Sequence, residues 1–368
     1  MMSSLVELSL DKVINNFDQA PFRAKECLSP QVAKDFYNKL PLPSQNVDKI
    51  HTLATFVDND EYWKRACKSK GKGGKVEEHG YCHKRMFFEL QLQDLLLSEE
   101  SLFQETIVER LKPFADCIYI LRLSGVRHSF PLDVVTTNLP NLMSIDLKQV
   151  SGLKDSIPKA ISSSPFLLSL VLTETQLTDA DVTLIIENLA QSQTLLHLDL
   201  SHNKITSTGV STICETLVAP ADSSILSNLD LSGNNISSEG ASIIGQALAT
   251  NESLISLNLR LNNIGDEDGA ILLQGLSKNT TLNHLNMAAN KLGSKSVKAL
   301  LQVLEKRLES EETDCCALES VVLTSNKFAH EDMVLLSQCQ CETCFVDVRS
   351  TSEPRKPSYE MLASVMPC

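Results

Sequence analysis

Long hydrophobic runs are missing from this chain of 368 residues. No uninterrupted apolar stretch approaches the roughly 18 residues that a membrane-spanning helix needs. The N-terminus lacks the basic, then apolar, then small-residue order of a secretory signal. The eleven Cys residues are scattered and odd in number, which favours reduced thiols over a disulfide framework. We therefore expect a soluble protein of the cytoplasm that makes no contact with a membrane.

Basic residues are also fewer than acidic ones, and the formal net charge is -13 at pH 7. Proteins that bind nucleic acid generally carry a basic surface, so no nucleic-acid partner is expected. The segment 64–85 departs from this balance and contains a basic, Gly-rich insert. It is either a solvated loop or a contact to an acidic protein surface, and in the second case tubulin is one such surface. The residues predicted for that contact are Lys64, Arg65, Lys68, Lys70, Lys72 and Lys75.

Motifs of catalysis are absent as well. The sequence has no Gly-x-Ser-x-Gly turn, and its Gly-rich run, residues 71–75, is followed by Val76 where a phosphate loop has Ser or Thr. We therefore predict that the protein is not an enzyme and takes no cofactor or small-molecule substrate.

Two groups of Cys and His residues could suggest a metal. Cys339, Cys341 and Cys344 offer three thiols without an evident fourth ligand, and their role stays open. The second group, His79, Cys82 and His83 with Cys67, fits the spacing of no common zinc finger. No metal site is predicted.

What the sequence does contain is a repeat, Leu-x-x-Leu-x-Leu-x-x-Asn-x-Ile. One copy runs from Leu195 to Ile205, with Asn203 at its Asn position. The Asn recurs 31, 28, 28 and 36 residues apart, which is typical of leucine-rich repeats at the long end of their range. The Asn amide can satisfy backbone groups where the chain leaves the strand. The Asn positions are Asn203, Asn234, Asn262, Asn290 and Asn326.

Each repeat is expected to pair a short strand with a helix. Apolar residues three and four apart predict helices over residues 179–190, 208–218, 238–249, 267–277 and 294–308. Weaker copies begin near Ile118, Leu142 and Leu167, with Thr175 at one Asn position, and their closer spacing predicts shorter helices. The sequence thus predicts an α/β leucine-rich repeat solenoid of the ribonuclease-inhibitor type, a curved parallel sheet with helices on its convex side. Eight strands are expected, and residues 345–348 are a candidate ninth.

The first 112 residues do not repeat and are predicted to form a helical N-terminal cap. Helices are expected near residues 5–17, 30–40 and 47–56, then from Asp58 and from His83 to Leu97, with Ser29 capping the second. The aromatic residues of the cap are expected to cover the open end of the solenoid. The predicted domains are therefore the cap at 1–112, the repeats at 113–338, and a Cys-containing C-terminal edge and tail at 339–368.

Three motifs of the cap carry a more specific resemblance. They are Asp11-Lys12-Val13-Ile14-Asn15-Asn16-Phe17, Asp60-Glu61-Tyr62-Trp63-Lys64-Arg65-Ala66-Cys67 and Lys84-Arg85-Met86-Phe87-Phe88-Glu89. Followed by repeats of this kind, they resemble the T-complex-associated testis-expressed protein 1 family, which is subunit 5 of the dynein regulatory complex. The basic insert and the C-terminal tail have no counterpart in that resemblance.

This resemblance implies a non-enzymatic scaffold of the nexin link in motile cilia or flagella. The implied partners are other subunits of the complex and doublet microtubules, and the implied location is the cytoskeleton of the axoneme. An alternative is a ubiquitin-ligase adaptor, since Leu40-Pro41, an apolar helix and Trp63 also resemble an F-box. The interval from Pro41 to Trp63 is short for a full F-box.

A binding surface is expected on the inner face of the sheet. Residues between the core Leu positions point away from the core, because side chains alternate along a strand. This strip is polar and has few aromatic residues, so either it receives a long segment of another subunit or it stays solvated. The candidate residues are Asp146, Lys148, His197, Asp199, Asn228, Asp230, Asn258, Arg260, His284 and Asn286.

Overall fold

The computed structural model describes residues 10, 12–19, 21–43, 47–71, 75–97, 104–128, 130–190, 194–218, 225–309, 318–337 and 344–348. The chain divides into two compact units. Among the described residues, the first unit holds those up to Arg122 and Phe130–Leu142, and the second holds residues 123–128 and 143–348. The domain boundaries expected at residues 112 and 338 stay a prediction.

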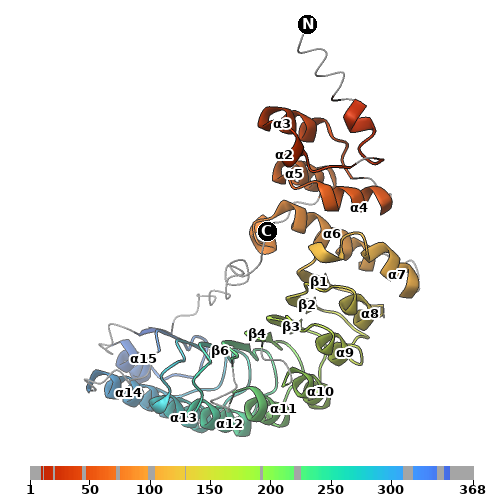
Figure 1. The fold of residues 1–368 in the computed structure, drawn as a ribbon. Helices are drawn as coiled ribbons and strands as arrows, with labels where there is room; N and C mark the ends of the chain where they lie inside the picture. The colour runs from red at the N-terminus through yellow and green to blue at the C-terminus, as the bar shows by residue number, and fades with distance from the viewer. Residues whose placement is uncertain are drawn as a thin grey trace. The chain divides into compact units, whose positions relative to one another are not determined.

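The first unit is helical, as the sequence predicts (Figure 1). Asn59 caps α5, because its side-chain oxygen accepts the N–H of Tyr62 at 2.9 Å. Ser29 occupies the predicted N-cap position of α3, but its side chain makes no capping hydrogen bond. Of the helix expected over residues 5–17, the structure describes residues 10 and 12–17, and residues 10 and 12–15 are helical. The helices and short turns of this unit are α2 (Ala24–Cys27), α3 (Pro30–Lys39), α4 (Val47–Phe56), α5 (Asp60–Ser69), η1 (Val76–His79), α6 (His83–Leu97), α7 (Gln104–Leu111), η2 (Ala115–Cys117) and α8 (Leu132–Thr137).

Aromatic side chains from α5 and α6 form the core of the first unit. The ring of Trp63 lies 5.3 Å from that of Phe87 and 5.0 Å from that of Phe88, and Phe88 stacks on Phe114. The indole N–H of Trp63 donates to the carbonyl of Val57 at 2.8 Å, so its polar edge is satisfied in the interior. These rings therefore fix how α5 and α6 pack together. Whether they also cover the end of the solenoid stays a prediction.

Nine strands in the described chain form one sheet in sequence order. From β2 to β9 every neighbouring pair is parallel and in register, so that Leu198 pairs with Leu229 and Leu229 with Leu257. The candidate ninth strand is confirmed. The strands are β1 (Ile120–Ser124), β2 (Ser144–Lys148), β3 (Ser169–Thr173), β4 (His197–Asp199), β5 (Asn228–Asp230), β6 (Ser256–Asn258), β7 (His284–Asn286), β8 (Ser320–Val322) and β9 (Phe345–Asp347).

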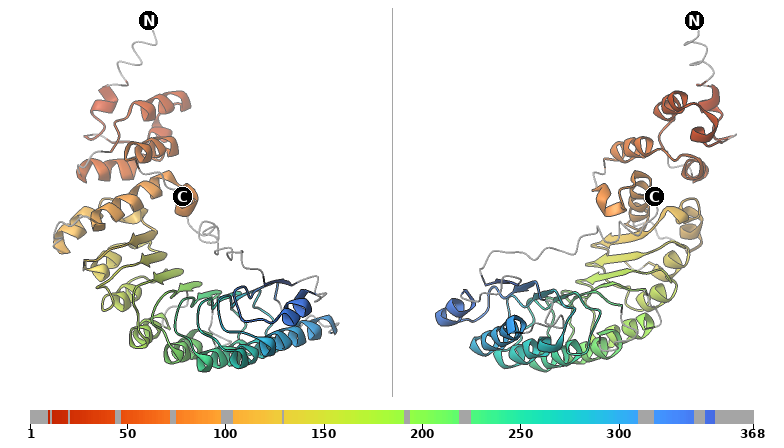
Figure 2. Two further views of the ribbon diagram at one scale, coloured as in Figure 1. Left: turned by 180° about the vertical axis from the view of Figure 1, so that it is seen from behind. Right: turned by 60° about the vertical axis from the view of Figure 1, so that its left-hand side comes forward.

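Within the second unit the strands line the inner side and the helices the outer side (Figures 1 and 2). The prediction of shorter early helices is confirmed, because α9 has 6 residues whereas α10 has 11 and α14 has 16. The predicted helix at 208–218 differs in detail, since α11 ends at Ile213 and continues as a π-helical turn, η3 (Cys214–Val218). The helices are α9 (Ile157–Ser162), α10 (Asp179–Leu189), α11 (Ser207–Ile213), α12 (Ser238–Leu248), α13 (Asp266–Gly275), the short η4 (Leu276–Lys278), α14 (Ser294–Glu309) and α15 (His330–Ser337).

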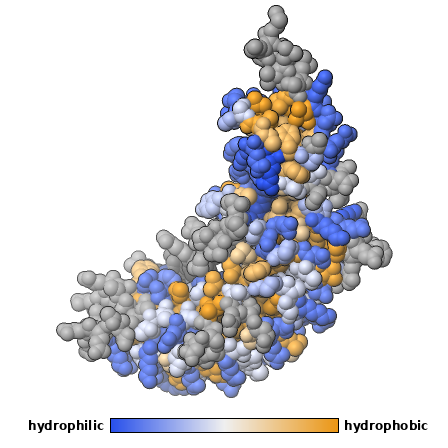
Figure 3. Space-filling model, viewed as in Figure 1, coloured by the Kyte–Doolittle hydropathy of each residue, from blue (hydrophilic) through white to orange (hydrophobic). Residues whose placement is uncertain are grey.

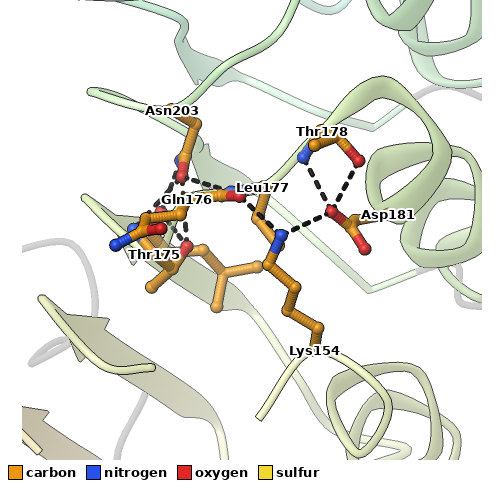
Figure 4. A network of polar contacts seen from close by, with 8 residues as sticks. Lys154, Thr175, Gln176, Leu177, Thr178, Asp181 and Asn203 are labelled. Atoms are coloured by element: carbon orange, nitrogen blue, oxygen red, sulfur yellow. Dashed lines mark hydrogen bonds and ion pairs between the residues drawn. The ribbon is translucent and has the colours of Figure 1, made fainter. Parts of the chain in front are cut away.

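The Asn residue of each repeat joins that repeat to the one before it. The Asn203 amide nitrogen donates to the carbonyl of Leu200 at 2.9 Å and, in the preceding repeat, to that of Leu172 at 2.8 Å. Its oxygen accepts the N–H of Leu177 at 3.0 Å (Figure 4). Buried backbone groups that would otherwise be unpaired are thus satisfied. Equivalent bonds to the preceding repeat are made by Asn234, Asn262, Asn290 and Asn326.

The residue before each Asn position turns the chain out of the strand. Its φ angle lies between 53° and 67° in seven consecutive repeats, in the left-handed region. Only one of these seven residues is Gly, although Gly adopts this conformation most readily. The turn therefore depends on the repeat as a whole, since it also forms before Val150 and Thr175, where Asn is absent. The seven residues are Gln149, Glu174, His202, Gly233, Leu261, Ala289 and Ser325.

No helix within the described ranges has the length and apolar character to cross a membrane. On the face drawn in Figure 3, the described hydrophobic and hydrophilic residues alternate in small groups.

Candidate interaction surface

Nine of the ten predicted inner-face residues lie on β2 and on β4 to β7. Arg260 lies two residues after the end of β6. They differ in exposure. Lys148, Arg260 and His284 are exposed, Asn228 and Asn286 are buried, and the others are partly buried. The structure thus brings the candidates onto adjacent strands, although not all of them are open to a partner.

Four of these residues form a row across adjacent strands, which we call the inner polar row: Asp199, Asp230, Asn258 and Asn286. Each side-chain oxygen accepts the backbone N–H two residues later, over 2.8 to 3.2 Å. This is an Asx turn, a bond that Asp and Asn make with equal ease. The row therefore has a structural role that sequence reasoning missed. Its signal is the recurrence of Asp or Asn just before the last Leu of each strand motif.

The two carboxylates of the inner polar row are direct neighbours. Asp199 and Asp230 are partners in the register of β4 and β5, and neighbouring strands lie about 4.8 Å apart. Asp230 accepts hydrogen bonds from Ser232 Oγ at 2.6 Å and from the Asn258 amide at 2.8 Å. Asp199 accepts one from Thr173 Oγ1 at 3.3 Å. In the described chain, neither carboxylate forms an ion pair with a Lys, Arg or His side chain.

Burial and the charge of Asp199 both affect the pKa values of Asp230 and His197. Burial raises the pKa of Asp230 above its ordinary value, and the neighbouring carboxylate of Asp199 raises it further. Burial lowers the pKa of His197, against the opposing effect of Asp199. At neutral pH, His197 is therefore a neutral imidazole beside an acidic pair.

Two polar atoms of this face are buried without a hydrogen-bond partner: His197 Nδ1 and Asn286 Nδ2. Buried polar atoms are normally paired, because an unpaired one costs about 1–3 kcal/mol. His197 lies two residues before Asp199 on the same face of β4, and Asn286 closes the inner polar row on β7. The inner face therefore holds unmet hydrogen-bonding capacity next to unpaired negative charge.

Several residues of the predicted basic contact are occupied within the first unit. The Arg65 guanidinium donates to the carbonyls of Asn38 and Tyr37, the latter at 2.8 Å. Lys70 bonds to Gln91 and lies 4.7 Å from the centre of the Phe87 ring. Lys64 pairs with Glu61 at 3.2 Å. Lys68 and Lys75 are exposed, and Lys72 lies outside the described residues.

No group of three or more His, Cys, Asp or Glu side chains in the described parts of the chain is arranged to hold a metal ion. Two His residues of the cap bond to carboxylates: His79 to Glu89 at 2.5 Å and His83 to Asp60 at 2.7 Å. Burial raises the pKa of the Cys67 thiol to about 11, so it is protonated at neutral pH. Cys339 and Cys341 lie outside the described residues, and Cys344 is buried.

Sequence reasoning missed the role of Glu89, a buried carboxylate in α6. One of its oxygens accepts the backbone N–H groups of Tyr119 at 3.1 Å and Ile120 at 2.8 Å, and the other bonds to His79 Nδ1. Glu89 therefore fixes the start of β1 to α6. The only signal in the sequence is a Glu among the apolar residues of that helix.

A protein-family model described as Leucine Rich repeat matches residues 191–214, 224–245, 250–271 and 278–301. The matched segments carry β4 to β7 together with the inner polar row. The fold is a leucine-rich repeat solenoid. Leiomodin-1 Actin-Binding Site 2, a solved structure, is 17% identical to this leucine-rich repeat chain with a TM-score of 0.35, over 43% of this chain and 93% of that one.

The leucine-rich repeat chain is also similar to dynein regulatory complex subunit 5 over part of its length. The Mus musculus protein is 33% identical over 94 residues, which are 25% of this chain and 17% of that protein. The Chlamydomonas reinhardtii protein is 27% identical over 212 residues, which are 56% of this chain and 49% of that protein. The chain thus spans at most about half the length of these relatives.

Proposed function

We propose that this protein is a non-enzymatic scaffold and interaction subunit of the nexin-dynein regulatory complex, where it helps to control dynein-driven motility of cilia or flagella. The observation that carries the proposal is the similarity to dynein regulatory complex subunit 5, which reaches 56% of this chain in the Chlamydomonas protein. Its partners would be other subunits of that complex, and its location the axoneme.

The leucine-rich repeat surface suits such a role. In-register parallel strands from β2 to β9 repeat the same side-chain rows over many residues, which provides a long binding surface. The residues on it are mostly short and polar, without the aromatic anchors of a compact hot spot. A surface of this kind fits an extended segment of another protein better than a small molecule.

The basic insert is a second candidate contact. Because Arg65, Lys64 and Lys70 bond within the first unit, a contact to an acidic surface such as tubulin would rely on the exposed Lys68 and Lys75. Binding of purified protein to microtubules, with Lys68→Glu/Lys75→Glu as the variant, tests this part separately. Equal binding by variant and wild type would remove Lys68 and Lys75 from the proposed interface.

Localisation tests the main proposal directly. A tagged full-length chain expressed in cells with motile cilia should enter the cilium and stay on the axoneme after the membrane is removed with detergent. Dynein regulatory complex subunits should be recovered with it from the axonemal extract. A diffuse cytoplasmic or nuclear signal, with stable recovery of a cullin and its linker subunit, would overturn the proposal in favour of the ubiquitin-ligase adaptor.

A further inference from the structure

The inner polar row uses two residue types for one structural task. Asp199 and Asp230 accept the N–H of residue i+2 at 2.8 Å, and Asn258 and Asn286 make the same bond at 3.2 and 3.0 Å. The turn is thus formed equally by a neutral amide and by a carboxylate. The negative charge on Asp199 and Asp230 therefore has no role in forming the turn.

That charge is unfavourable in the isolated chain. The two carboxylates are partners on adjacent strands, both are partly buried, and burial and mutual repulsion raise the pKa of Asp230. In the described chain no cationic side chain compensates them, and the nearby Arg260 is exposed and forms no ion pair. Because the turn itself does not need this charge and no cation of the described chain offsets it, the pair favours a cation supplied from outside.

Each carboxylate of the pair accepts hydrogen bonds within the sheet, and one ring nitrogen beside the pair has no partner. Asp199 and Asp230 each present carboxylate oxygens, and the unpartnered His197 Nδ1 lies on the same face two residues before Asp199. A neutral imidazole has one acceptor nitrogen. The small side chains of Ser201 and Ser232 follow in the next row of this face, and both are buried.

We infer that Asp199, Asp230 and His197 form a receptor for an arginine side chain presented by an extended segment of a partner protein. The planar guanidinium has five N–H donors in a fixed fork, which can bridge carboxylates on neighbouring strands and reach a third acceptor. A lysine ammonium offers a point charge without that geometry. The unpartnered Asn286 Nδ2, two strands from Asp230, would donate to a backbone carbonyl of the same segment.

This inference deepens the proposed function and rests on it for the partner's place in the axoneme, whereas the receptor itself is testable on the isolated protein. The probe is a synthetic tripeptide, acetyl-Gly-Arg-Gly-amide, titrated into the purified full-length chain with NMR detection of the His197 and Asp side chains. The comparison peptides replace Arg by Lys and by citrulline, which has the shape of Arg without its charge. We expect shifts at His197, Asp199 and Asp230 with Arg, at least fivefold weaker binding with Lys, and no binding with citrulline.

The variants are chosen to keep the fold. Asp199→Asn preserves an acceptor for the N–H of Ser201 and leaves the bonds of Asp230 untouched, so it should fold and should weaken arginine binding about tenfold. Asp199→Asn/Asp230→Asn should abolish it. The matched control is Glu187→Gln/Glu252→Gln, which removes the same charge from exposed positions outside the sheet. Equal responses to Arg and citrulline, or unchanged binding by a folded Asp199→Asn protein, would overturn the inference.

The same variants in ciliated cells separate this inference from the proposed function. If the receptor operates in the complex, retention of the Asp199→Asn/Asp230→Asn protein on extracted axonemes should fall at least threefold, and that of the control pair should not. If the wild-type protein is found on the axoneme and the double variant is retained equally well, the arginine receptor is rejected and the proposed scaffold function is not affected. Wild type absent from the axoneme would reject the scaffold, while the peptide titration would still decide whether the arginine receptor exists.

Discussion

The side chains of Thr175 and Asn203, which occupy the same position in successive repeats, touch each other. Thr175 Oγ1 lies 3.3 Å from Asn203 Oδ1, and it also bonds to the carbonyl of Leu172 at 3.0 Å. In its own repeat Asn203 bonds the equivalent carbonyl, that of Leu200. Thr175 thus replaces one of the Asn bonds, which is why the repeat tolerates Thr there.

Removal of the Asn203 amide should strongly destabilise the second unit. In Asn203→Ala, the backbone N–H groups of Thr175 and Leu177 lose their partner in the interior, and the carbonyl of Leu172 loses one of its partners but keeps Thr175 Oγ1. We expect the free energy of unfolding to fall by about 3–5 kcal/mol, because each buried group left unpaired costs about 1–3 kcal/mol. Urea denaturation followed by far-UV circular dichroism measures this loss.

The matched control is Asn235→Ala. Asn235 is exposed, directly follows the repeat Asn234, and no side-chain hydrogen bond of it is described. Its substitution should change the free energy of unfolding by no more than about 0.5 kcal/mol. Similar losses for the two variants would mean that the Asn bonds between repeats add nothing beyond ordinary surface effects.

The repeat made most of the second unit predictable. Leu198, Leu229 and Leu257 recur at fixed offsets from Asn203, Asn234 and Asn262, so strand, register and turn followed from one pattern. The π-helical turn at Cys214–Val218 did not, because its five residues are too few for their apolar spacing to distinguish a π-helical from an α-helical turn. Local periodicity cannot separate these two backbone states.

Gly275 and Gly245 lie where α13 packs on α12. A Cβ on Gly275 would overlap the carbonyl oxygen of Gly245 and lie 2.8 Å from its carbonyl carbon. Gly→Ala in a helix normally stabilises it by about 1 kcal/mol. Here we expect the opposite sign, a loss of about 1–3 kcal/mol, since backbone atoms cannot move aside as a flexible side chain does.

Thermal or urea unfolding of Gly275→Ala beside Gln274→Ala measures this effect. Gln274 precedes Gly275 in α13 and is exposed, so its replacement should be nearly neutral. A Gly275→Ala protein more stable than wild type would show that the two helices separate easily at this point.

Asp266 caps the helix of the next repeat and should make stability depend on pH. Its carboxylate accepts the N–H groups of Gly293 and Ser296 at 2.8 Å and of Lys295 at 3.0 Å, at the start of α14. Burial alone would raise its pKa, but the bonds from Ser296, Lys295 and Gly293 outweigh burial and lower the pKa below its usual 3.8. The stabilisation is therefore present above pH 3.8 and is lost as the pH falls through the lowered value.

The comparison of wild type with Asp266→Asn isolates this contribution. At pH 7 the variant should be less stable by about 1 kcal/mol, the usual worth of a helix cap. The difference should shrink as the pH falls below the usual pKa of 3.8. Asp268→Asn, in the same first turn of α13, is the control and should show no such convergence. A difference that stays constant down to acid pH would contradict the capping role of the charge.

The interaction surface was only partly predictable. Strand alternation identified Asp199, Asp230 and His197 as residues of the inner face, and the structure places them there. Alternation could not show that Asp199 and Asp230 serve a turn, because that bond depends on the backbone conformation after the strand. In the same way, charge counting marked Arg65 and Lys70 as surface residues, although each bonds within the first unit. Composition reports charge but not its partners.

Glu89 should be essential for the first unit and dispensable for the second. In Glu89→Ala, the N–H groups of Tyr119 and Ile120 and the ring nitrogen of His79 lose their buried partner. We expect a loss of about 3 kcal/mol or more from unpaired buried groups. Glu89→Gln keeps one acceptor oxygen for the two N–H groups and should lose less. Trp63 is the only Trp of the chain and is fully buried in the first unit, so its fluorescence reports the unfolding of that unit alone.

The urea midpoint of Trp63 fluorescence should therefore fall in the order wild type, Glu89→Gln, Glu89→Ala. Glu77→Ala is the control, since Glu77 is exposed in η1 and has no described side-chain bond. Most of the circular dichroism signal comes from the strands and helices of the repeats. At the lower midpoint, only the part of this signal that belongs to the first unit should be lost. If the fluorescence midpoint of Glu89→Ala equalled that of Glu77→Ala, the link from α6 to β1 through Glu89 would add no stability. In that case the aromatic packing of Trp63, Phe87 and Phe88 alone would hold the first unit together.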